Sequence, residues 1–216
     1  MWVVAQIFEL SLPPFSTRLH RRIPTSATHL PERWALFTLI VLGESVVAVA
    51  VGTSGQDWRV DSVSAAVLGF AAVACVWWLY FDHQASIALT GSAMSVVVYS
   101  YAHIPLLLGL AAMSSGVRML IDRADQAHLG AGPSFALLGG AALFLLSLIG
   151  TRVVTIHAQH RLGVFLKLVA AAFILALLAA QSALPPLALA GGLPVILAGV
   201  VVAERTLIAP SLQNER

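Results

Sequence analysis

The sequence predicts an all-α polytopic membrane protein, a bundle of six full spans with a short partial helix at the N-terminus. Of its 216 residues, 59% are apolar and only 10% are charged, whereas soluble domains are roughly 25% charged. The charges also gather between long apolar runs, and roughly 20 apolar residues are enough to cross a bilayer. These features exclude an ordinary soluble domain and make the lipid bilayer the expected partner.

Six apolar runs qualify as spans, and together they form one integral membrane domain over residues 1–216. Each should be a helix, because a span must satisfy its backbone hydrogen bonds internally. The first dozen residues are apolar but too short to span, so they are predicted to be the end of a helix in an N-terminally truncated chain. The spans lie near residues 34–53, 63–81, 95–115, 134–151, 164–182 and 186–203.

Basic residues close to the span ends predict the orientation. If the spans alternate in direction, nine Lys and Arg residues fall on one side and three on the other. The side richer in these residues is normally cytoplasmic. Residues 18–33, 152–163 and 204–216, and so the C-terminus, are therefore predicted to face the cytoplasm, and residues 54–62 and 116–133 to face outward.

Glu44 lies about halfway through its predicted span, where an acidic residue costs about 2.5–3.5 kcal/mol on insertion scales. Another helix, a bound cation or water must offset that cost. One interpretation is a functional site for an ion, a proton or a ligand, which is the default for an acid inside the membrane. The other is a protonated Glu44 that holds two helices together through a hydrogen bond.

The third predicted span carries a polar stripe. Ser95, Tyr99 and His103 recur every four residues and so share one side of the helix. Pro105 has no backbone N–H, so the usual helical hydrogen bond from that position to the carbonyl oxygen of Tyr101 cannot form. The stripe is typical of a cavity lining, and Glu44, Tyr99 and His103 form a candidate site for an ion, a proton or a small polar solute. The alternative is a Tyr–His pair inside a packed bundle.

A second polar cluster is predicted at the cytoplasmic end. His29, Glu32 and Arg33 precede the first span, and Asp82 ends the second span at the same membrane depth. Capping of a helix start explains Glu32 without any functional site, because an acid favours the positive end of the helix dipole.

Other polar residues near the span ends are expected at the membrane interface. Trp77, Trp78 and Tyr80 at the end of the second span resemble an aromatic belt. Lys167, one turn inside its span, is expected to extend its charged end to the same surface.

Several functional classes find no support in the sequence. The single cysteine, Cys75, lies inside an apolar run, so neither a disulfide framework nor a cysteine-based metal site is expected. The arginines flank apolar runs without any nucleic-acid-binding motif. Hydrolase, metalloprotease and phosphate-loop motifs are absent, so no enzymatic activity, metal or cofactor is expected. The oligomeric state is left open.

Three stretches resemble one known family. The run from His29 to Val46, with the sequence HLPERWALFTLIVLGESV, is similar to the signature of the bacterial low temperature requirement protein A (LtrA) family. The stretches Trp77–Asp82 and Tyr99–Leu106 agree with the same family and follow in its order. The resemblance implies a polytopic inner-membrane protein associated with growth in the cold, with the earlier helices of the family absent from this chain. The resemblance identifies the family's motif positions in this chain, but it assigns no catalytic residue.

The leading functional hypothesis is a transporter or channel-like protein that handles a proton, a cation or a small polar solute. The alternative is a structural or regulatory membrane protein that takes part in cold adaptation without transport. An intramembrane lipid-modifying enzyme is a third interpretation.

Overall fold

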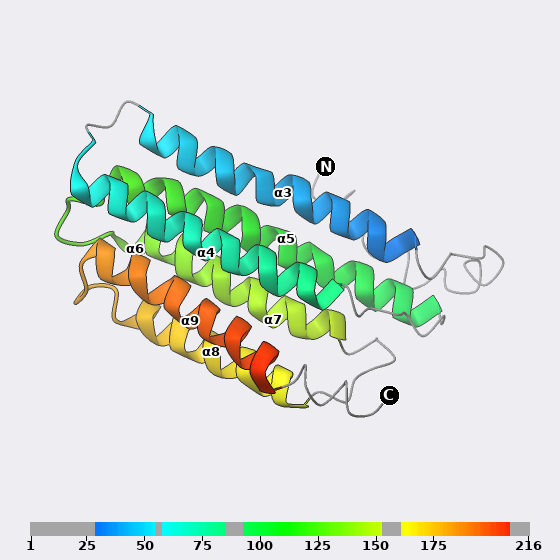
Figure 1. Ribbon diagram of the computed structural model, residues 1–216. Coiled ribbons are helices and arrows are strands. Elements are labelled where there is room, and N and C mark those ends of the chain that lie inside the picture. The colour runs from blue at the N-terminus through cyan, green and yellow to red at the C-terminus, as the bar shows by residue number, and fades with distance from the viewer. Residues whose placement is uncertain (1–28, 55–57, 85–92, 153–160, 208–216) are drawn as a thin grey trace, which may run out of the picture.

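Six long helices, drawn in Figure 1, dominate the part of the chain that the computed structural model describes, residues 29–54, 58–84, 93–152 and 161–207. Each is long and apolar enough to cross a membrane, which confirms the predicted helical membrane bundle. The predicted partial helix at the N-terminus lies outside the described residues. The elements are α3 (His29–Thr53), α4 (Val60–Gln84), α5 (Ala93–Asp122), α6 (Ala131–Ser134), η1 (Phe135–Gly139), α7 (Gly140–Arg152), α8 (Arg161–Ala179) and α9 (Pro186–Leu207).

Local sequence explains where two of the helices begin. Glu32 lies in the first turn of α3, where a carboxylate stabilises the positive end of the helix dipole. Pro186 is the first residue of α9, a position at which proline removes no intrahelical hydrogen bond.

The fourth span is built from α6, the π-helical turn η1 and α7 in direct succession. Helices α5 and α9 continue through Pro105 and Pro194.

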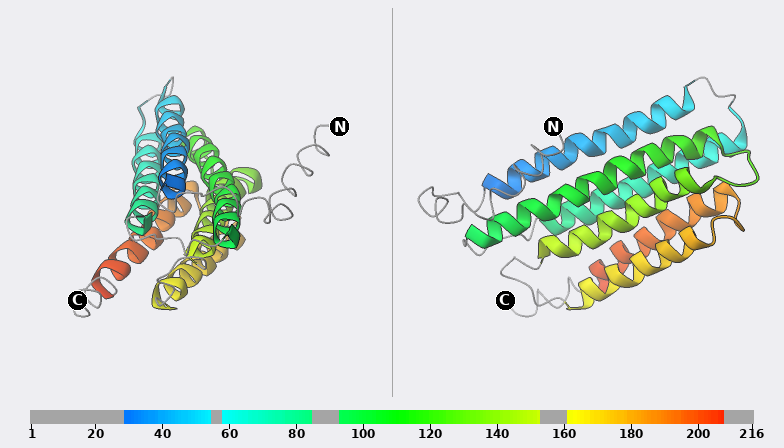
Figure 2. Two further views of the ribbon diagram at one scale, coloured as in Figure 1. Left: turned by 90° about the vertical axis from the view of Figure 1, so that its right-hand side faces the viewer. Right: turned by 180° about the vertical axis from the view of Figure 1, so that it is seen from behind.

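The helices pack in a closed order α3, α5, α7, α8, α9, α4, with a further contact between α4 and α5 (Figure 2). Helices α3 and α5 run parallel. Trp34 meets His103 near one end, and eleven residues further along both helices Ser45 meets Ser114, with hydroxyl oxygens 2.5 Å apart. Residues 35–44 of α3 therefore lie between two contacts, one aromatic and one polar, that fix this register.

Helix α5 and the fourth span approach each other closely. A Cβ added at Gly109 would lie 2.7 Å from the carbonyl oxygen of Gly140, and one at Gly140 would lie 2.6 Å from that of Gly109. A Cβ at Gly116 would collide with the backbone of Leu137 in η1. Small residues permit such contact in membrane proteins, where close packing is a main source of helix association.

The outer faces of the bundle are largely apolar. Ile40 of α3, Phe173 of α8 and Val195 of α9 are 61–71% exposed. The interior is filled by fully buried side chains such as Leu110 and Phe144. The apolar outer faces match the hydrocarbon of a bilayer, in keeping with the span assignment.

Candidate functional site

Glu44 does not point into the described bundle. On α3 the buried residues Thr38, Leu42 and Ser45 form the side that packs on α5, whereas Glu44 and its neighbour Gly43 are exposed. A Cβ added at Gly43 would meet no described atom within 4 Å. The carboxylate therefore lies on the outer side of the described helices, and its role as an ion site stays a prediction.

His103 lies inside the bundle with no exposed surface, and both of its ring nitrogens are hydrogen-bonded. Nδ1 lies 2.8 Å from the carbonyl oxygen of Tyr99, and Nε2 lies 3.1 Å from the hydroxyl oxygen of Tyr80 on α4. Because a carbonyl oxygen only accepts, Nδ1 carries the hydrogen and donates it. Nε2 of the neutral ring then accepts from the hydroxyl of Tyr80.

Aromatic rings enclose the same histidine. The ring of Trp34 on α3 stacks on it with centroids 4.9 Å apart, and the Tyr99 ring lies 4.5 Å away. Tyr99 is itself fully buried. Glu44 follows Trp34 by ten residues, about 15 Å along the helix axis at 1.5 Å per residue. The structure thus brings Tyr99 and His103 together and leaves Glu44 apart, so the expected three-residue site is not formed by the described helices.

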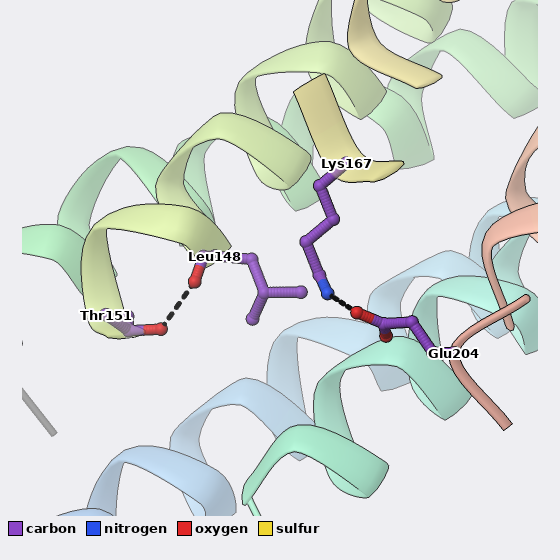
Figure 3. A network of polar contacts seen from close by, with 4 residues as sticks. All are labelled: Leu148, Thr151, Lys167 and Glu204. Atoms are coloured by element: carbon purple, nitrogen blue, oxygen red, sulfur yellow. Dashed lines mark hydrogen bonds and ion pairs between the residues drawn. The ribbon is translucent and has the colours of Figure 1, made fainter. Parts of the chain in front are cut away.

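Lys167 forms a buried ion pair that the sequence analysis did not predict. Its side chain has no exposed surface, and its Nζ donates to Oε1 of Glu204 on α9, which is 12% exposed (Figure 3). The expectation that Lys167 reaches the membrane surface was wrong. The side chain lies on the side of α8 that packs against its neighbours, together with the buried Gly163, Ala170, Ala171 and Ile174.

The charges near Lys167 are few. The elements that pack substantially on α8 are η1, α7 and α9. Among them η1 has no ionisable residue, α7 has Arg152, and α9 has Glu204 and Arg205. On the described elements that pack on α8, Glu204 is therefore the one carboxylate able to balance the ammonium.

Arg205, next to Glu204, is directed toward α4. Its guanidinium lies 4.1 Å from the ring centre of Trp78 and 3.5 Å from a carboxylate oxygen of Asp82. These contacts bind the end of α9 to the end of α4. They also hold the positive charge of Arg205 against α4 and away from Lys167.

The predicted cytoplasmic-end cluster is divided. His29 Nδ1 lies 3.3 Å from a carboxylate oxygen of Glu32, with both side chains strongly exposed, and Arg33 is also exposed. Asp82 binds Arg205 instead. Within the described ranges no group of three or more His, Cys, Asp and Glu residues could hold a metal ion.

The two buried pairs lie at one level of the bundle. Arg205 touches Trp78 and Asp82, and Tyr80 lies midway between them on α4. Glu204, adjacent to Arg205, is therefore level with Tyr80, the partner of His103. We call Tyr80, His103, Lys167 and Glu204 the polar layer.

The sequence held one signal for the missed residues: Lys167 is the chain's one lysine and stands in an apolar run. Spacing about the turn does not predict its partner, because α8 ends at Ala179, 12 residues after Lys167, whereas Glu204 lies 18 residues after Pro186, the first residue of α9. Tyr80, by contrast, was expected at the membrane interface, and its full burial depends on α5 lying over that side of α4.

Comparisons with known proteins identify the chain at family level. An uncharacterized protein of Rhizobium meliloti (strain 1021) is 27% identical over 167 residues. The match covers 67% of this chain but 39% of that relative, so the chain spans well under half of the relative's length. No solved structure matches. The family model described as bacterial low temperature requirement A protein (LtrA) matches residues 1–202, and the chain therefore belongs to the LtrA family.

Proposed function

We propose that this multi-pass membrane protein moves a proton, a cation or a small polar solute across the bacterial inner membrane, with Lys167 and Glu204 as the central site. The observation that carries the proposal is the complete burial of the Lys167 ammonium against Glu204. The site lies near the end of the bundle predicted to be cytoplasmic. Glu204, the slightly exposed member, is the point at which a solute meets the pair.

Energetics argue against packing as the only role of the pair. Removing an ammonium and a carboxylate from water costs several kcal/mol per ion, which their attraction often fails to recover. Apolar residues of similar volume would often be equally stable or more so. Ionisable residues that are retained inside a membrane bundle commonly mark ion or solute pathways.

A second function is supported by the other half of the polar layer. Both ring nitrogens of His103 are satisfied within the bundle and Trp34 covers the ring, an arrangement that suits helix packing. A structural or regulatory membrane protein would use both buried pairs, Tyr80–His103 and Lys167–Glu204, to hold its helices together. The family name connects such proteins with growth at low temperature.

Reconstitution separates the two functions. Liposomes that contain the purified protein and an internal pH-sensitive dye are given a pH gradient in sodium or potassium salts, and light scattering follows the entry of neutral polar solutes. We expect protein-dependent flux that Glu204→Gln slows by roughly tenfold, the effect of about 1.4 kcal/mol on a barrier.

The matched control is Asp125→Asn, which removes a carboxylate from an exposed pair with Arg59 at the opposite end of the bundle. This variant should retain the wild-type flux. Equal flux in wild type and folded Glu204→Gln would support the structural function, and absence of any protein-dependent flux would contradict transport.

A further inference from the structure

The Lys167–Glu204 pair has the composition of a site at which a cation and a proton compete. We propose that the Lys167 ammonium occupies a monovalent cation site on Glu204, and that a sodium- or potassium-like ion binds Glu204 as Lys167 loses one proton. This inference rests on the proposed transport function and names the chemical class that the same site takes.

Charge balance sets the stoichiometry. The resting pair carries one positive and one negative charge in an apolar interior, where an unbalanced charge is expensive. When a monovalent cation binds to the Glu204 carboxylate, the proton of Lys167 Nζ passes to water and leaves a neutral amine. The site is neutral before and after, with one cation bound for each proton released. A divalent cation would leave an excess charge.

The surroundings favour this exchange. No other carboxylate lies on η1, α7 or α9, the described elements that pack substantially on α8, so none of these elements compensates an additional positive charge. Arg205 is the nearest arginine along α9, and its guanidinium is bound to Asp82 and Trp78. The Arg205 contacts keep its charge on α4 and leave Glu204 turned toward Lys167.

Exposure favours a cation over an anion. An anion would have to reach Lys167, which has no exposed surface. A cation has to reach only Glu204, which is 12% exposed. If an anion bound to the Lys167 ammonium instead, Glu204 would take up a proton to keep the site neutral. The test below distinguishes this alternative from cation binding.

The experiment uses the fact that Lys167 is the one lysine of the chain. Protein labelled with [15N]lysine and purified in detergent has one Nζ resonance, whose position distinguishes ammonium from amine. Sodium chloride and potassium chloride are titrated in. N-methylglucamine chloride controls for ionic strength, and N-methylglucamine acetate supplies a carboxylate anion without a small cation.

We expect sodium or potassium to shift the resonance from ammonium to amine, with no change in either N-methylglucamine salt. Competition with one proton predicts that the apparent cation affinity rises about tenfold for each pH unit, because cation binding releases that proton. Asp125→Asn should respond as wild type does. Glu204→Gln should lose its response to the cations.

A resonance that neither cation moves would overturn the inference. A resonance that moves with acetate alone would assign an anion in place of the cation. Failure of the inference and failure of the transport function remain distinguishable, because the resonance reports binding in detergent and the liposomes report flux. Flux without a cation response removes this inference only, whereas a cation response without flux removes transport.

Discussion

The hydroxyl oxygen of Tyr80 on α4 lies 3.1 Å from Nε2 of His103 on α5, and both side chains are fully buried. Tyr80→Phe keeps the ring but leaves Nε2 without its donor, and an unsatisfied buried polar group costs about 1–3 kcal/mol. We expect the free energy of unfolding in detergent to fall by about this amount.

A double-mutant cycle isolates the Tyr80 contact from the effect of volume. Tyr80→Phe measured in a His103→Phe background should cost much less than in wild type, because residues in contact couple by about 0.5–3 kcal/mol. Equal costs in the two backgrounds would show that the hydrogen bond contributes nothing.

Glu204→Gln should destabilise the bundle because it leaves the Lys167 ammonium buried beside a neutral amide. Breaking a buried pair on one side costs about 3–5 kcal/mol. The double variant Lys167→Met with Glu204→Gln removes both charges and should recover most of that loss. Chemical unfolding of the three proteins measures this order, and a double variant less stable than Glu204→Gln would contradict it.

Gly116→Ala should weaken the packing of α5 on η1, because the added methyl group collides with the backbone of Leu137. Overpacked substitutions cost about 1–3 kcal/mol. Gly199→Ala on α9 is the matched control, since a Cβ there meets nothing within 4 Å. Thermal unfolding should place Gly116→Ala below wild type and Gly199→Ala at or above it.

Single-cysteine labelling tests the predicted orientation in a Cys75→Ala background. Trp58 is 81% exposed before α4, and the Glu32 side chain is 68% exposed at the start of α3. In intact cells stripped of their outer membrane, an impermeant maleimide should label Trp58→Cys at once and Glu32→Cys only after permeabilisation. The opposite pattern would place the C-terminus outside.

Much of the fold could be predicted because it follows from chain composition. Each predicted span overlaps one of the six long described helices, the fourth being α6, η1 and α7 in succession. The ends differ: α5 continues to Asp122, seven residues past the predicted end, and α8 stops at Ala179, three residues before it. Apolar run length predicts where a helix crosses hydrocarbon but not where it ends in water or protein. The predicted polar stripe on α5 did bring Tyr99 and His103 together in the interior.

The partners of the polar residues could not be predicted in the same way. Helical periodicity indicates that residues share a face, but it does not say which face another helix covers. Glu44 therefore looked like an interior acid and lies on the exposed side of α3. Lys167 looked like an interfacial lysine and is fully buried. Tertiary packing decides both, and neither the length of an apolar run nor helical periodicity carries that information.

The most direct test of the central claim compares Lys167→Arg with wild type in the liposome flux assay. Arginine preserves the positive charge and can donate to Glu204, but it does not give up its proton in proteins. A site that exchanges a proton for a cation therefore predicts that a Lys167→Arg protein that still folds has lost cation-driven proton flux. A folded Lys167→Arg protein with wild-type flux would contradict the account.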